Sequence, residues 1–294
     1  MEKILLDTDI GNDIDDTVCL AYLLRQKKCE ILGITTVSGE PVERAKITSA
    51  FLRAEGREEI PIYPGVEAPI LTPQKQPFPH QKIYLPKWSH ETKFPEGEAI
   101  EFMRRTIRAN PGEVTLLAVG PLTNVALLFA VDPEIPHLLK ELVIMGGIFA
   151  YSYIDNPCLT EWNARCDPYA TSIVYGAPVK NMVSVGLDVT QQVILQKEEI
   201  IDLFTTDMLK VVLAFSGILE GTREVIAFHD PLAAAMIFEK DLCTFERGNV
   251  EVETDSTPLE GLTSFTVDEK GNDEIAVAVD RERYFKHYFD ICKE

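Results

Sequence analysis

Short apolar runs alternate with longer runs of helical periodicity along most of this chain of 294 residues. The apolar runs, which suit strands, span residues 3–7, 30–37, 60–63, 114–119, 141–145 and 181–185. The helical runs span residues 15–25, 42–54, 97–110, 123–129, 168–175 and 231–238. Strands that are apolar throughout are typical of parallel sheets that helices cover on both faces. The alternation therefore predicts an α/β fold with a mostly parallel, Rossmann-like open sheet flanked by helices.

Two segments interrupt this alternation. Residues 67–95 hold many of the prolines and several aromatic residues. A long irregular segment of this kind is usually a functional lid or a disordered piece, and we interpret it as a lid. Residues 197–228 predict a helical insertion, and residues 249–254 and 264–267 predict a late hairpin before a further strand and helix. With 46% hydrophobic residues the chain can bury one large core, so we expect a single domain over residues 1–294.

The overall charge limits the possible partners. The chain has 47 acidic and 28 basic residues, which gives a formal net charge of -19. Nucleic acid and anionic membrane surfaces are therefore poor partners, and a small neutral substrate held by a cation fits better. The chain shows no basic-then-apolar leader, no apolar run long enough to cross a bilayer, and six cysteines without a CxxC pair. We expect a cytoplasmic protein.

Five aspartates lie within ten residues at the end of the first predicted strand: Asp7, Asp9, Asp13, Asp15 and Asp16. Open α/β sheets bind their ligands at this edge, where a strand ends and a helix begins. Carboxylates at short range repel one another and raise each other's pKa, and a divalent cation removes that cost. Oxygen ligands of this type indicate a hard cation, calcium or magnesium, rather than zinc.

Three further motifs follow predicted strands or begin predicted helices. They are Leu122-Thr123-Asn124, then Met145-Gly146-Gly147 with Glu161-Trp162-Asn163 shortly after it, and His229-Asp230-Pro231. In the last motif Asp230 suits a helix N-cap, because proline favours the first position of a helix.

Together with the acidic run, these motifs resemble those of the nucleoside hydrolase family, the inosine–uridine-preferring N-ribohydrolases, from residue 3 to roughly residue 265. The resemblance implies the nucleoside hydrolase fold and a calcium-dependent enzyme. Such an enzyme hydrolyses the N-glycosidic bond of a ribonucleoside to ribose and a free nucleobase, in nucleoside salvage. It also implies assembly into a homodimer or homotetramer.

The resemblance also implies roles for individual residues. The calcium ligands would be Asp9, Asp16, the backbone carbonyl of Thr123, and Asp230. Asp9 would also be the general base, and His229 the acid for the leaving group. The substrate-binding residues would be Asp15, Glu40, Met145, Asn156, Glu161 and Asn163, with Asp155 as an alternative to Asn156.

The chemistry explains why these residue types would be needed. N-glycosidic cleavage passes through a ribosyl cation of oxocarbenium character, which nearby carboxylates stabilise. A metal lowers the pKa of a bound water and orients the sugar through its diol. A histidine with a pKa near neutrality suits the protonation of the departing base.

Glu40 is the clearest departure from the family pattern, because the best-known members carry asparagine at this position. A carboxylate there can accept a hydrogen bond from ribose but cannot donate one. The identity of the nucleobase therefore stays open, and so does the alternative of a catalytically weak nucleoside- or calcium-binding member. A metal-dependent phosphohydrolase of the haloacid dehalogenase type is a further alternative, although Gly11 stands where that family has threonine or valine.

Overall fold

A computed structural model describes residues 1–149 and 159–293. Within these residues one nine-stranded sheet has the order β10-β9-β11-β6-β5-β4-β1-β2-β3. The strands are β1 (Glu2–Thr8), β2 (Cys29–Thr36), β3 (Ile62–Pro64), β4 (Val114–Ala118), β5 (Glu141–Met145), β6 (Met182–Val185), β9 (Cys243–Val252), β10 (Thr263–Val267) and β11 (Asp273–Val279). All neighbouring strands pair in parallel except β9, which is antiparallel to both β10 and β11. The predicted α/β fold with a mostly parallel sheet is therefore confirmed, and so is the late hairpin, which forms the antiparallel edge.

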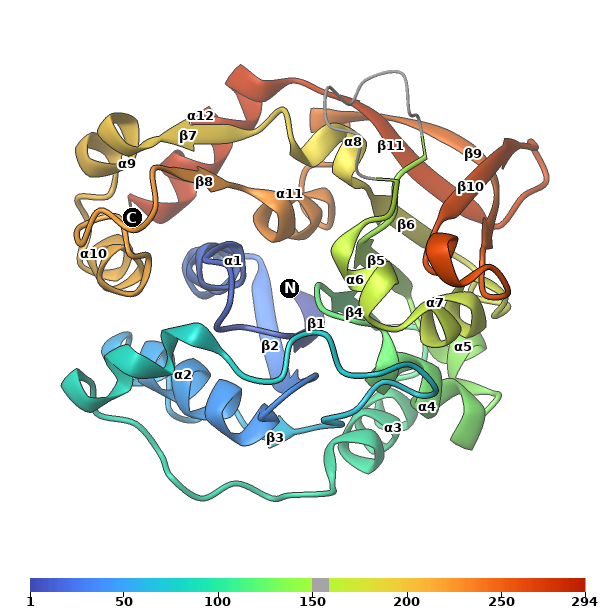
Figure 1. Cartoon of the computed structure of the whole chain (residues 1–294), viewed down its shortest axis with the longest axis horizontal. Coiled ribbons are helices and arrows are strands. Elements are labelled where there is room, and N and C mark those ends of the chain that lie inside the picture. The colour runs from blue at the N-terminus through green and yellow to red at the C-terminus, as the bar shows by residue number, and fades with distance from the viewer. Residues whose placement is uncertain (150–158, 294) are drawn as a thin grey trace.

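Helices cover both faces of this sheet (Figure 1). One layer contains α1 (Asp15–Arg25), α2 (Pro41–Ala54), α10 (Asp207–Phe215), α11 (His229–Met236) and α12 (Arg281–Cys292). The other contains α3 (Ala99–Ala109), α4 (Thr123–Val131), α5 (Ile135–Leu138) and α7 (Pro168–Tyr175). The shorter helices are α6 (Trp162–Cys166), α8 (Leu187–Thr190), α9 (Lys197–Leu203) and the 3-10 turns η1 (His80–Lys87), η3 (Lys240–Leu242) and η4 (Thr257–Leu259).

The alternation of side chains along β1 explains why the strand is apolar throughout. Ile4 and Leu6 pack into the core beneath the first layer, and Leu5 packs into the core beneath the second. Leu5 is 1% exposed and Leu6 2% exposed, so truncation of either to alanine should cost about 2–5 kcal/mol of unfolding free energy. This packing fixes the carboxyl end of β1, from which the acidic run continues.

The predicted insertion is partly wrong in its content. Residues 197–228 hold the expected helices α9 and α10, but they also hold the strand β8 (Val225–Ala227). This strand pairs antiparallel with β7 (Ile194–Gln196) in a separate two-stranded sheet. Strands of three residues are too short for a visible period of two in the sequence. Among residues 67–95, η1 is the one regular element that the structure describes.

The predicted N-cap role of Asp230 is also wrong. Helix α11 begins one residue earlier, at His229, and Phe228 occupies the N-cap position. Asp230 therefore lies inside the first turn, and its carboxylate faces α1 rather than the end of its own helix. None of the helices in the described part of the chain has the length and apolar character needed to span a membrane.

Candidate active site

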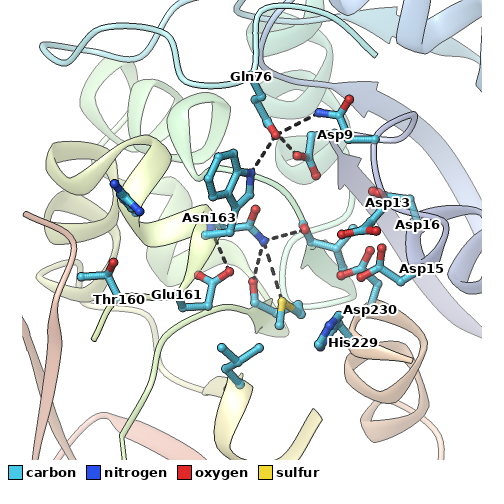
Figure 2. A pocket seen from close by; sticks show the side chains of 16 residues that line it. Asp9, Asp13, Asp15, Asp16, Gln76, Thr160, Glu161, Asn163, His229 and Asp230 are labelled. Carbon is cyan, nitrogen blue, oxygen red and sulfur yellow. Dashed lines mark hydrogen bonds between the residues drawn. The ribbon is translucent and has the colours of Figure 1, made fainter. Parts of the chain in front are cut away.

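A cavity of about 200 Å³ opens at the carboxyl edge of the sheet (Figure 2). The first turns of α1, α6 and α11 converge on it, and the ends of β1 and β5 form part of its wall. The residues that line it are Asp9, Asn12, Asp13, Asp15, Asp16, Gln76, Val119, Met145, Thr160, Glu161, Trp162, Asn163, Arg165, Leu187, His229 and Asp230. The structure therefore brings together three of the four motifs that the sequence singled out.

Three buried carboxylates form the centre of this cavity. One oxygen from each of Asp15, Asp16 and Asp230 lies within 4.8 Å of the other two. The aspartates come from the first turns of α1 and α11, and these helices pack directly against each other. Burial, followed by repulsion from neighbouring aspartates, raises the pKa of all three carboxyl groups well above the usual range. A cluster of this kind favours a hard cation, because the ion offsets both burial and repulsion.

Asp9 lies beside this cluster and is held by Gln76. The Gln76 amide donates from Nε2 to Asp9 Oδ2 at 2.6 Å, and its Oε1 accepts from Trp162 Nε1 at 2.9 Å and from Asn12 Nδ2 at 3.2 Å. Burial raises the pKa of Asp9 as well. Gln76 is only 5% exposed, yet no feature of the sequence distinguished it from the other polar residues of 67–95.

Glu161 and Asn163 connect α6 to the ends of β4 and β5. The Glu161 carboxylate caps α6, where it accepts from the amides of Asn163 at 2.7 Å and Ala164 at 2.9 Å, and it also accepts from Gly147 at 3.2 Å. Asn163 Nδ2 donates to the carbonyls of Val119 and Met145. Burial raises the pKa of Glu161 to about 7. The structure thus places Met145, Glu161 and Asn163 together at the cavity, as the resemblance implied.

His229 begins α11 and lies next to the acidic cluster. Its Nδ1 is 2.7 Å from the Thr190 hydroxyl, and its enclosure lowers its pKa to about 4. The sequence suggested a histidine with a pKa near neutrality. In the folded chain the imidazole is instead neutral at pH 7, when it can donate one hydrogen bond.

Thr123 and Asn124 support the site from behind. Thr123 is the first residue of α4, and its hydroxyl donates to Asp167 at 2.7 Å. It is not among the described residues that line the cavity. Asn124 donates to Asp7 at 2.7 Å, and Asp7 also accepts from the Thr35 hydroxyl. Asp7 therefore ties β1 to β2 and α4.

Glu40 and Asp13 take part in ion pairs, and Asn156 is not described. Glu40 forms an ion pair of 2.6 Å with Lys82 on η1 and is not among the described residues that line the cavity. Asp13 lies at the cavity mouth, where it forms an ion pair with Arg223. Asn156, with its alternative Asp155, lies outside the described residues.

Comparison with known proteins adds independent findings. The family model described as inosine-uridine preferring nucleoside hydrolase matches residues 4–286. Over 273 residues the chain is 32% identical to a probable uridine nucleosidase 1 of Oryza sativa subsp. japonica, covering 86% of this chain and 82% of that protein. It is also 32% identical to the non-specific ribonucleoside hydrolase RihC of Escherichia fergusonii over 277 residues, which cover 90% of this chain and 88% of that one. Among solved structures, the plant nucleoside hydrolase PpNRh1 matches with a TM-score of 0.84 at 25% identity, covering 99% of this chain and 98% of that chain.

Proposed function

The chain belongs to the inosine-uridine preferring nucleoside hydrolase family, and we propose that it cleaves the N-glycosidic bond of a ribonucleoside with the help of one calcium ion. The observation that carries this proposal is the group of Asp15, Asp16 and Asp230, whose carboxylate oxygens lie within 4.8 Å of one another. This group shares one cavity with Glu161 and His229.

The donor set fits a calcium ion. Calcium takes six to eight oxygen ligands and tolerates irregular geometry, and this cavity offers carboxylate oxygens from two helices. We propose Asp9, Asp16, the Thr123 carbonyl and Asp230 as ligands, with Asp15 close enough to bind the ion or a ribose hydroxyl. When bound, the ion would supply positive charge that makes water more acidic and orients the sugar diol.

The remaining residues have complementary roles in this proposal. Asp15, Glu161 and Asn163 hold the ribose hydroxyls, and Met145 forms the wall beneath the ring. Asp9 accepts a proton from the attacking water while the water oxygen forms its bond to C1′. The bond from C1′ to the base nitrogen breaks while the neutral His229 donates a hydrogen bond to that nitrogen. The departing base then takes up, by way of solvent, the proton that Asp9 accepted, so one proton passes overall from water to the base. The buried carboxylates stabilise the oxocarbenium character of the sugar between these events.

A second cavity, of about 390 Å³, gives the leaving base a place to bind. It shares Asn12, Asp13, Gln76 and Trp162 with the acidic cavity. The rings of Phe78, His80 and Trp162 line it, and these rings can stack on a nucleobase. Because stacking is tolerant of base identity, this arrangement is compatible with purine and pyrimidine nucleosides.

The test is the release of reducing sugar from a panel of ribonucleosides, with added calcium and after chelation. Calcium-dependent release of ribose is the expected result. Calcium binding without release from any nucleoside would favour the alternative of a catalytically weak binding protein. Phosphate release from a generic phosphoester would instead favour a phosphohydrolase.

Three further properties stay predictions: a role in salvage, a cytoplasmic location, and assembly as a homodimer or homotetramer. Light scattering tests the state of assembly.

A further inference from the structure

Arg44 is a fully buried cation whose role neither the sequence motifs nor the proposed reaction explains. It lies in the first turns of α2, and its side chain is 0% exposed. Its Nε donates to the carbonyls of Ser38 at 3.0 Å and Gly39 at 3.1 Å. Its Nη1 donates to the carbonyls of Asp9 and Ile10. One guanidinium therefore joins the loop after β1 to the loop after β2.

The loop after β2 needs such a constraint. Ser38 has a φ of 68° and Glu40 a φ of 54°, both in the left-handed region that side chains with a Cβ disfavour. Such a conformation brings the Cβ too close to the following carbonyl oxygen and therefore has a backbone cost. The carbonyls that Arg44 binds belong to Ser38 and Gly39, so its bonds stabilise this conformation directly.

The same loop supports the segment that carries Gln76. A Cβ on Gly39 would lie 2.2 Å from the Gln76 carbonyl and 2.4 Å from Pro77, so the two backbones are in close contact. The Ser38 hydroxyl also donates to Gln74 Oε1, which in addition accepts from the backbone N–H of Gln76. Arg44 thus acts on both attachments of Asp9, namely its backbone and the segment whose Gln76 side chain holds its carboxylate.

The positive charge of Arg44 also interacts with carboxylates of the acidic cavity. Its hydrogen bonds end on backbone carbonyls, and the carboxylates of Asp9 and Asp16 are the anions that act on it most strongly. A buried guanidinium is costly unless neighbouring charges and hydrogen bonds compensate it. Two of those neighbours are proposed calcium ligands.

We propose that Arg44 is a positioning residue of the active site, an inference that rests on the hydrolase function proposed above. Its guanidinium fixes the backbone of Asp9 and Ile10 against Ser38 and Gly39, so that the Asp9 carboxylate keeps its orientation. Lysine cannot do this, because a single ammonium cannot reach carbonyls on two loops in the way a planar fork can.

The first experiment compares Arg44→Lys with Arg25→Lys. Arg25, at the far end of α1, forms an ion pair of 2.5 Å with Glu55, so its replacement is a matched control for loss of stability. For Arg44→Lys we expect the dissociation constant for calcium, measured by calorimetry with the metal alone, to rise at least about tenfold. We also expect kcat to fall about 10²-fold with little change in KM, since small misplacement of a catalytic group has this effect. Arg25→Lys should stay within twofold of the original protein in all three quantities.

A second experiment separates positioning from packing. In Arg44→Ala, ethylguanidinium should restore calcium affinity and turnover, whereas ethylammonium should not, because only the former can bond to both loops. If Arg44→Lys does not fold, the same measurements are made on Arg44→Lys combined with Ser38→Gly, since glycine removes the backbone cost at position 38. Calcium affinity and kcat equal to the original protein in a folded Arg44 variant would overturn the proposal.

Failure of the proposed function gives a different result. In that case the original protein would release no ribose from any nucleoside, while the loss of calcium affinity in Arg44→Lys and its rescue by ethylguanidinium would still be measurable. A normal rate in the original protein together with an unaffected Arg44→Lys would instead contradict only the role of Arg44.

Discussion

Gln76 Nε2 donates to Asp9 Oδ2 at 2.6 Å, although 67 residues separate the two in the sequence. The side-chain oxygen of Gln76, Oε1, accepts from the Trp162 indole, and this bond fixes which end of the side-chain amide faces Asp9. The segment over residues 67–95 therefore contributes a side chain to the acidic cavity and directly contacts the proposed general base.

The first prediction concerns this amide. Gln76→Leu keeps the approximate shape of the side chain but removes a hydrogen bond to a charged group, which is worth about 1.5–3 kcal/mol. We expect kcat/KM to fall about 10- to 100-fold. In Gln76→Glu we expect kcat/KM to fall further, because this change places a second carboxylate beside Asp9. Gln26→Leu, a buried glutamine at the far end of α1, is the control and should leave kcat/KM unchanged. Normal turnover in Gln76→Glu would show that Gln76 does not hold Asp9 during the reaction.

The second prediction tests Asp9 as the general base. Asp9→Ala should abolish measurable turnover, and Asp9→Asn should lower kcat by at least about 10²- to 10⁴-fold, the usual contribution of general base catalysis. Asp13→Asn is the matched control within the same acidic run, since Asp13 is exposed and paired with Arg223. Its kcat should stay within tenfold of the original value. Equal losses in the Asp9 and Asp13 variants would mean that charge at the cavity, rather than proton transfer, is what matters.

Local sequence patterns predicted the elements that hold the site. The helix from Asp15 to Arg25 was predicted with the bounds that the structure has, because the acidic first turn and the apolar run after it are both local signals. The convergence of the first-strand aspartates with His229-Asp230 was implied only by the resemblance, because the strand before His229 belongs to the separate two-stranded sheet.

Other features depend on contacts that no local pattern reveals. Gln76 and Arg44 lie 67 and 35 residues from Asp9, and their role is visible only once the chain is folded. The error at Asp230 has a similar cause. Aspartate before proline locally favours an N-cap, yet in the folded chain α11 begins one residue earlier and packs against α1.

The third prediction is that calcium stabilises the protein in a way that depends on pH. Added calcium at 100 times its dissociation constant should raise the unfolding free energy by about 2.7 kcal/mol. The raised pKa of Asp15, Asp16 and Asp230 keeps part of the cluster protonated at mildly acidic pH, and the ion requires ionised ligands. Calcium affinity should therefore rise from pH 5 to pH 8. Calorimetry across this range tests the direction, and an affinity that falls with pH would contradict it. Asp230→Asn should lose most of the stabilisation.

The fourth prediction concerns Asp273, far from the cavity on β11. Burial raises the pKa of Asp273 to about 6 from a usual value near 4. Between these values the carboxyl group is protonated in the folded chain and ionised in the unfolded chain, so stability should fall as pH rises through this window. Asp273→Asn removes the charge and should unfold about 2–4 °C higher than the original protein at pH 8, a gain of about 1 kcal/mol after allowance for solvent screening. At pH 4 the two should unfold at the same temperature, and equal melting at both pH values would disprove the assignment.

The last prediction separates the role of His229 from that of the metal cluster. A nucleobase needs a hydrogen bond or a proton as it departs, whereas 4-nitrophenolate leaves readily without either. His229→Ala should therefore lower kcat/KM for natural ribonucleosides by about 10²-fold and leave the rate on 4-nitrophenyl riboside within about threefold. Its neighbour on the same helix serves as the contrast, because Asp230→Asn should impair both substrates through loss of calcium. If His229→Ala loses activity equally on both ribosides, the imidazole acts on the sugar or the ion rather than on the leaving group.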